Sequence, residues 1–232
     1  MTSSIAYAGL FSSSLSDADA AAVHKITVMT VLGETLYVDR LGLTVFGNEA
    51  FHVAVPEWGI DNLLTDHIVQ AIQHGGRFSA EALNLAALPV DVKASDSAYD
   101  LSKHRRLAIL NQAKAQGADT VLLFLRERNV HDRNMPPGFG IYSQKLLKHE
   151  EAYLFASFGV HLFRVDGDSA LAQQHPDPAF QPGYKQPLKS AWDQYSAEEK
   201  SALELTLKQA IILRADSVLD SMRLSTRSAL GE

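Results

Sequence analysis

The sequence predicts an α/β (α+β) fold, in which a mixed β-sheet with an antiparallel meander is flanked by three main helices. Three observations support this prediction. Residues 60–74 carry apolar side chains at the 3.6-residue period of an amphipathic helix. Residues 118–125 form an apolar run typical of a buried strand, directly after a second helical pattern and Gly117. Residues 196–199, Ser-Ala-Glu-Glu, form a capping box that predicts the start of a long final helix.

Apolar and β-branched runs predict strands in the first part of the chain. Residues 25–32 and residues 35–46 are both strand-like, and Gly33-Glu34 lies between them. Glycine adopts the positive φ of the first central position of a type II′ turn without strain, so we expect these two strands to form a hairpin. Residues 51–55 predict a third short strand, which Pro56 ends.

The central part of the chain predicts two helices with an ambiguous segment between them. The helix over residues 60–74 begins with Asp61, whose charge suits the N-terminal dipole, and stops at Gly75-Gly76. Residues 77–85 alternate weakly, which is compatible with a strand or with a helix. Residues 101–116 predict the second helix.

The pattern after the buried strand predicts an antiparallel meander. Residues 140–147 and 152–165 are strand-like, and Asp166-Gly167 is a strong hairpin signal that leads to a short strand near residues 170–172. The order of elements contains no glycine-rich turn that joins a strand directly to a helix, which argues against a doubly wound nucleotide-binding fold.

The expected organisation is a flexible N-terminal tail over residues 1–23 and a single α/β domain over residues 24–232. The tail is rich in serine and alanine without a helical or strand period. Residues 173–190 predict an irregular, proline-rich loop. The final helix is expected over about residues 196–223.

Composition excludes several classes of protein. A net charge of −6 argues against a dedicated nucleic-acid-binding protein, which would normally carry a basic face. The absence of cysteine excludes disulfides, thiolate zinc sites and a cysteine nucleophile, and no motif predicts a cofactor. No apolar run approaches the ~20 residues of a transmembrane helix. The N-terminus lacks the pattern of a signal peptide, so we expect the cytoplasm for the sequence as written, or the periplasm if a leader was removed.

The densest polar cluster follows the predicted buried strand and is the candidate ligand site. It contains Arg126, Arg128, His131, Asp132 and Arg133. Loops at the carboxyl ends of such strands often hold ligands, and several arginines together can bind a carboxylate or phosphate. His131 beside Asp132 offers acid–base chemistry. The alternative is a solvated connector whose charges pair with each other.

Two further groups of residues have both a functional and a structural interpretation. Tyr184, Trp192 and Tyr195 surround the proline-rich segment and predict a protein-interaction surface, or else aromatic anchors that pin the loop to the body. His67 and His74 share a helix face but lie seven residues apart. Metal-binding pairs on a helix sit three or four residues apart, so we expect surface histidines and no metal site.

Three segments in the first part of the chain resemble a family of uncharacterised proteobacterial proteins: residues 26–33 (Ile-Thr-Val-Met-Thr-Val-Leu-Gly), residues 42–48 and residues 58–61 (Trp-Gly-Ile-Asp). The layout of a helix, residues 117–119 (Gly-Ala-Asp) before a strand, and a meander ending at residues 163–167 is similar to a second group. That group is the N-terminal domains of envelope lipoproteins of the curli-secretion and Tol-translocation kind. These resemblances imply an envelope-associated, non-enzymatic role.

Together, these observations predict a non-enzymatic binding or assembly protein that uses a sheet edge or the proline-rich flank as its contact surface. The alternative is a small-molecule enzyme or receptor with an anionic ligand held by the loop over residues 126–133. Self-association through the long C-terminal helix is compatible with either function.

Overall fold

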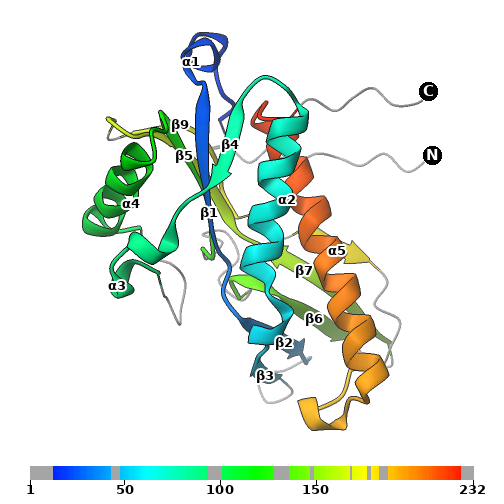
Figure 1. The fold of residues 1–232 in the computed structure, drawn as a ribbon. Helices are drawn as coiled ribbons and strands as arrows, with labels where there is room; N and C mark the ends of the chain where they lie inside the picture. Colours follow the sequence, from blue (N-terminus) through cyan, green and yellow to red (C-terminus); the bar gives the residue numbers. More distant parts are fainter. Residues whose placement is uncertain are drawn as a thin grey trace, which may run out of the picture.

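The computed structural model describes residues 13–42, 48–93, 101–127, 136–146, 149–167, 169–176, 179–182 and 188–225. In these residues, ten strands form two five-stranded mixed sheets, and five α-helices pack around them (Figure 1). This arrangement confirms the α/β (α+β) fold class. The strands are divided between two sheets, whereas the sequence predicts one.

The first sheet, sheet A, has the order β4-β1-β5-β8-β9. Its strands are β1 (Lys25–Val31), β4 (Ser79–Ala82), β5 (Thr120–Leu125), β8 (Gly159–Arg164) and β9 (Ala170–Gln174). Strands β4, β1 and β5 run parallel, and β8 and β9 are antiparallel to their neighbours. The carboxyl ends of β1 and β5 therefore meet at one edge of the sheet.

The second sheet, sheet B, has the order β10-β7-β6-β2-β3. Its strands are β2 (Thr35–Leu41), β3 (Glu49–Ala54), β6 (Gly138–Leu146), β7 (His149–Ser157) and β10 (Ala179–Pro182). Only β2 and β6 are parallel to each other, and the other neighbours are antiparallel.

The helices of the described residues are α1 (Asp17–Ala22), α2 (Ile60–His74), α3 (Val90–Lys93), α4 (Lys103–Ala115) and α5 (Ala197–Ser221), with short 3₁₀ turns η2 (Pro56–Trp58), η3 (Leu85–Ala87) and η4 (Trp192–Gln194). Helices α2 and α5 lie side by side, while α4 covers the opposite face of sheet A (Figure 1). The long helices α2, α4 and α5 are the three main helices predicted. Across the part of the chain described above, no helix has both the length and the apolar character needed to cross a membrane.

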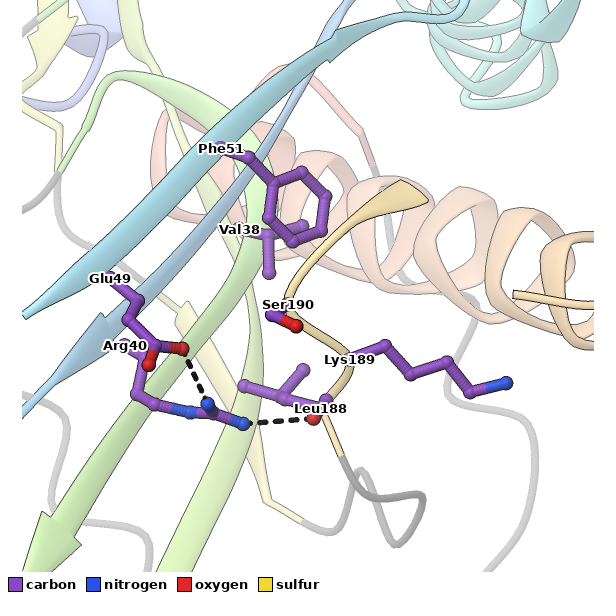
Figure 2. Close-up of a pocket in the computed structure, with 7 residues that line it drawn as sticks. All are labelled: Val38, Arg40, Glu49, Phe51, Leu188, Lys189 and Ser190. Atoms are coloured by element: carbon purple, nitrogen blue, oxygen red, sulfur yellow. Dashed lines mark hydrogen bonds and ion pairs between the residues drawn. The ribbon is translucent and has the colours of Figure 1, made fainter. Parts of the chain in front are cut away.

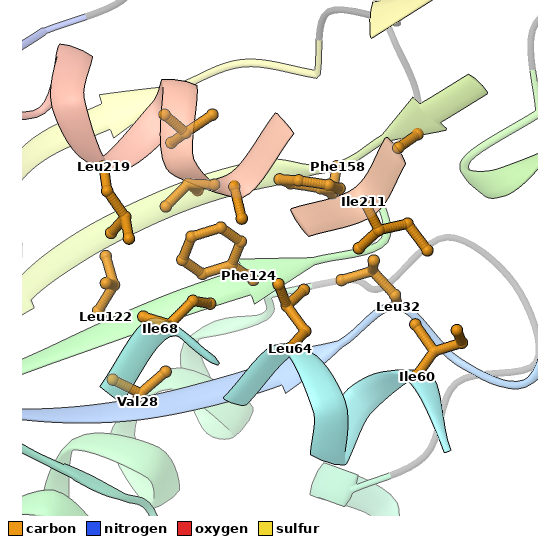
Figure 3. Packing of buried hydrophobic residues seen from close by; sticks show 14 of the residues in the cluster. Val28, Leu32, Ile60, Leu64, Ile68, Leu122, Phe124, Phe158, Ile211 and Leu219 are labelled. Atoms are coloured by element: carbon orange, nitrogen blue, oxygen red, sulfur yellow. The ribbon is translucent and has the colours of Figure 1, made fainter. Parts of the chain in front are cut away.

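The largest hydrophobic cluster is shared by both sheets and by helices α2 and α5 (Figure 3). Leu64 and Ile68 of α2 and Ile211 of α5 are fully buried in it. Phe124 of sheet A packs against Phe158 with 5.5 Å between ring centroids. A second cluster, between sheet A and α4, contains the side chains on the other face of β1 and β5.

The predicted hairpin between β1 and β2 is wrong, because these strands belong to different sheets. Both edges of β1 are occupied by β4 and β5, which leaves none for β2. Gly33, with φ +83°, turns the chain from one sheet to the other instead of back on itself.

The strand expected over residues 152–165 is likewise divided between the two sheets. Its first part belongs to β7 in sheet B and its second part is β8 in sheet A. The buried ring of Phe158 lies at the point of crossing. The antiparallel pairing of β6 with β7 and of β8 with β9 agrees with the predicted meander.

The ambiguous segment over residues 77–85 contains a strand, β4, parallel to β1. Helix α2 has the predicted bounds, and α5 begins at the predicted capping box, in which Ser196 accepts from the Glu199 amide and Glu199 accepts from the Ser196 amide.

Two segments expected to be irregular contain regular structure. Within the predicted tail, α1 is capped by Ser16, and Leu15 is fully buried; residues 1–12 lie outside the described residues. Within the predicted proline-rich loop, β9 extends to Gln174 and β10 pairs with β7 at the margin of sheet B. An edge strand tolerates a proline such as Pro182, because one side of the strand needs no amide donor.

Candidate functional site

The polar groups that follow β1 and β5 gather at the carboxyl edge of sheet A and form the candidate site. Arg126 follows β5 directly, and its backbone N–H donates to the Val31 carbonyl at 2.8 Å. Its side chain is among the largest fully enclosed ones in the described residues, with the residue 2% exposed. A buried guanidinium requires compensating polar partners, so its surroundings define what the site can do.

Two glycines make room for the Arg126 side chain. A Cβ on Gly33 would lie 2.9 Å from Nη1 of Arg126, and a Cβ on Gly138 would lie 3.2 Å from its Cδ. Both glycines have positive φ, +83° and +98°. The guanidinium is thus enclosed at the crossover between the two sheets, where it contributes to holding the fold together.

Asp61, in the first turn of α2, ties that helix to the same crossover. Its carboxylate accepts hydrogen bonds from the backbone amides of Leu32 at 2.7 Å and Gly33 at 3.3 Å. Thr30 donates to the Asp61 carbonyl at 2.7 Å, which fixes the start of the helix against β1. The N-terminal helix dipole also favours a negative charge here.

Burial raises the pKa of Asp61 from 3.8 to about 6. The hydrogen bonds from Leu32 and Gly33 oppose the rise, the nearby Glu34 carboxylate adds to it, and the Arg126 guanidinium also opposes it. A carboxyl group with this pKa gains and loses its proton close to neutral pH. Sequence reasoning identified Asp61 only as a helix-start residue, because the amides it binds lie far away in the chain.

A carboxylate–imidazole pair lies beside the crossover, on the face of sheet A that α4 covers. Nε2 of His161 is 2.9 Å from Oε1 of Glu127, and both side chains are mostly buried. The His161 ring stacks on Phe163 with 5.9 Å between centroids. Gly159 leaves the space that the Glu127 carboxylate occupies, since a Cβ there would overlap it. The pair connects β8 to the segment that follows β5.

The remaining predicted ligand residues and one predicted surface residue cannot be placed relative to this cluster. Arg128, His131, Asp132, Arg133 and Tyr184 lie outside the described residues. For these five the ligand-binding and interaction hypotheses stay predictions. Of the five predicted ligand residues, only Arg126 is described, and its side chain is buried in the protein.

The other two aromatic residues predicted as an interaction surface attach the segment before α5 to the body. Tyr195 is 3% exposed, and its hydroxyl accepts from the Lys189 amide at 3.1 Å. Trp192 packs edge-on against Trp58, with centroids 6.3 Å apart, and Lys200 Nζ lies 5.0 Å from the Trp192 ring centroid. These contacts correspond to the anchoring role that the sequence analysis offers as the alternative.

A small hollow lies between strands β2 and β3 and the segment that leads to η4 (Figure 2). Arg40 crosses it, donating to Glu49 at 2.6 Å and to the Leu188 carbonyl at 2.8 Å. The enclosed volume of about 10 Å³ has room for a single water molecule and is far below that of a metabolite site.

The helix histidines take part in structure where their contacts are described. Nε2 of His67 lies 2.6 Å from Oδ1 of Asp216, which connects α2 to α5. Within the described ranges, no group of three or more histidine, aspartate or glutamate side chains is arranged to hold a metal ion.

Comparisons with known proteins find only remote structural similarity. No family model matches it, and no curated protein matches it. Among solved structures, a protein from Xanthomonas campestris, XCC0632, shares 9% identity at a TM-score of 0.42, covering 87% of this chain and 85% of that one. A PelC dodecamer from Paraburkholderia phytofirmans shares 10% identity at a TM-score of 0.34, covering 88% and 89%, and a dodecamer of a PelC variant has a TM-score of 0.35 at 10% identity, covering 93% and 95%.

These similar proteins come from proteobacteria, and none of the three is described as a curli-secretion or Tol-type lipoprotein. The resemblance to that lipoprotein group therefore stays a prediction. Likenesses this remote carry no inference about function.

Proposed function

We propose that this protein is a non-enzymatic binding or assembly protein that uses the outer face of α5 as its contact surface. The observation that carries the proposal is the exposure of Leu205 and Leu213 on this helix, at 60% and 55%. Single exposed leucines are common, but these two are aligned on one face of a 25-residue helix whose inner face is fully packed.

A contact over these leucines gains free energy from the burial of apolar surface. Fully burying an exposed leucine contributes about 1.5–3 kcal/mol, so covering the exposed parts of Leu205 and Leu213 contributes about 2–4 kcal/mol before the costs of association. The rest of the helix supports such a contact, because α5 is anchored on both sheets and to α2 and presents a rigid surface.

The polar cluster at the crossover favours this interpretation over a ligand site. Asp61 is engaged with the backbone amides of the crossover, and Arg126 is enclosed between two glycines. Both groups therefore serve the connection between the sheets. A binding function on α5 leaves this arrangement undisturbed.

Site-specific photo-crosslinking tests the proposal. A benzoylphenylalanine residue replaces Leu205 or Leu213 in cells that produce the protein, and Leu107 is the matched control. Leu107 is a 40% exposed leucine on α4, which covers the far face of sheet A. We expect a discrete crosslinked product from the two α5 positions and none from Leu107. Equal labelling from all three positions, or none from α5, would refute the proposed contact surface.

A further inference from the structure

The exposed face of α5 carries a ridge that reads the same in both directions. Residues at intervals of four along the helix are Ser201, Leu205, Gln209, Leu213 and Ser217, and each of them is exposed. The order serine, leucine, glutamine, leucine, serine is a palindrome centred on Gln209. The ridge contains no charged side chain, although 21% of the whole chain is Asp, Glu, Lys or Arg.

Residues four apart on a helix form an inclined ridge, and such ridges fit into the grooves beside the ridges of a second helix when the helices cross at about −50°. In an antiparallel two-fold arrangement the ridge lies alongside its own reversed copy. We propose that α5 pairs with α5 of a second copy of this chain in an antiparallel, two-fold contact centred on Gln209. The inference rests on the proposed function, since it names the partner of the same surface.

In this register each residue of the ridge has a chemically suitable neighbour in the second copy. Leu205 lies beside the partner's Leu213, and Leu213 lies beside the partner's Leu205, at two points separated by about 12 Å along the helix. Gln209 meets the partner's Gln209 at the two-fold axis, where each amide can both donate and accept a hydrogen bond. Ser201 and Ser217 place small polar groups where the crossing helices diverge.

The palindrome is the reason to choose a second copy as the occupant. An isologous contact requires a surface that is complementary to itself, and the reversed order of the ridge provides this complementarity. The charges of Glu204 and Lys208 beside the ridge are paired with each other at 2.6 Å, so they do not oppose the approach of the second copy.

The contact is expected to be reversible. A single helix crossing buries less than the roughly 1,200 Å² of a standard interface, so we expect a dissociation constant on the order of 10 µM. Sedimentation velocity from about 1 to 200 µM should therefore show a monomer–dimer equilibrium within this range.

The absence of cysteine makes the symmetry axis directly testable. Gln209→Cys introduces the only thiol in the chain, located at the proposed axis. Under mild oxidation at 100 µM we expect most of this variant to form a covalent dimer. Gln70→Cys, at an exposed position of α2, is the matched control and should stay largely monomeric. Equal dimer formation by the two variants would overturn the proposal.

Charge substitutions test the antiparallel register. Leu205→Glu alone and Leu213→Lys alone should each weaken the dimer roughly tenfold or more, since each places a charge against leucine. The double variant places a carboxylate beside an ammonium group at both contacts and should recover affinity to within about threefold of the wild type. A double variant that stays monomeric would overturn the antiparallel register, because parallel pairing sets like charges together. Circular dichroism confirms that each variant is folded.

The outcomes separate this inference from the proposed function. A chain that is monomeric at 200 µM, with photo-crosslinks from Leu213 to a different protein identified by mass spectrometry, refutes the two-fold pairing and leaves the proposed function standing. A monomeric chain with no crosslink from α5 refutes both. A dimer whose affinity is unaffected by Leu205→Glu refutes the contact described here.

Discussion

Asp61→Asn should remove a pH dependence of stability that originates at the crossover between the sheets. In the folded protein the Asp61 pKa is raised to about 6, mainly by burial, against an ordinary value of 3.8. The folded state therefore binds a proton at this site more readily than the unfolded state. As the pH falls through 6, this difference stabilises the fold, and the gain is complete below pH 3.8.

The magnitude follows from the two pKa values. Between pH 8 and pH 5, Asp61 becomes protonated in most folded molecules and in few unfolded ones. The full rise in pKa corresponds to about 1.4 kcal/mol over this interval. Because the residue is only half-buried, we expect about 1 kcal/mol. Asparagine is neutral at every pH and can still accept from the Leu32 amide, so the variant should lack this contribution.

Urea unfolding at pH 8, 6.5 and 5 measures the effect as the difference between wild type and variant, which cancels groups common to both. The free-energy difference should shift by about 1 kcal/mol in favour of the wild type as the pH falls from 8 to 5. Asp66→Asn, at an exposed position on the same helix, is the control for the loss of a carboxylate from α2. A constant difference for Asp61→Asn, or a shift of opposite sign, would refute the reasoning.

Four further substitutions test the packing and the cap of α5 by urea unfolding. Gly33→Ala should cost about 2–3 kcal/mol, because it combines a positive φ with overlap on Arg126. Gly76→Ala, which also has positive φ but faces open space, should cost only about 1 kcal/mol, and equal costs would contradict the role of the overlap. Ser196→Ala removes the cap of α5 and should cost about 1 kcal/mol; no change would mean that the capping box does not stabilise the helix. Leu64→Ala should cost about 3 kcal/mol, and a cost under 1 kcal/mol would place this side chain outside the core.

Local patterns were sufficient to predict the helices but not the pairing of the strands. The capping box at Ser196 and the apolar period of α2 depend on neighbours within a few residues, so they can be identified without tertiary information. The hairpin signal at Gly33 is equally local, but the hairpin does not form, because β4 and β5 occupy both edges of β1. Val28 and Met29 point to opposite faces and are both buried, which is typical of an interior strand of a sheet that is covered on both faces.

The candidate site was predictable only in part for the same reason. The position of Arg126 after a buried strand indicated its location at the carboxyl edge of the sheet. The inward orientation of the Arg126 side chain depends on the space that Gly33 and Gly138 leave for it. No local sequence pattern predicts that these two glycines lie next to Arg126. The role of Asp61 likewise depends on amides brought to it by the fold.

Helix α5 follows every strand of both sheets in the chain, and this order has a consequence for synthesis. Until residues 197–221 have left the ribosome, the apolar faces that Ile211 and Leu219 cover have no partner. The nascent chain therefore exposes the inner side of β5 and α2 while most of the protein has already been made. Such a chain needs protection from aggregation during translation, and slow or interrupted synthesis before α5 should yield insoluble product rather than a partly folded intermediate.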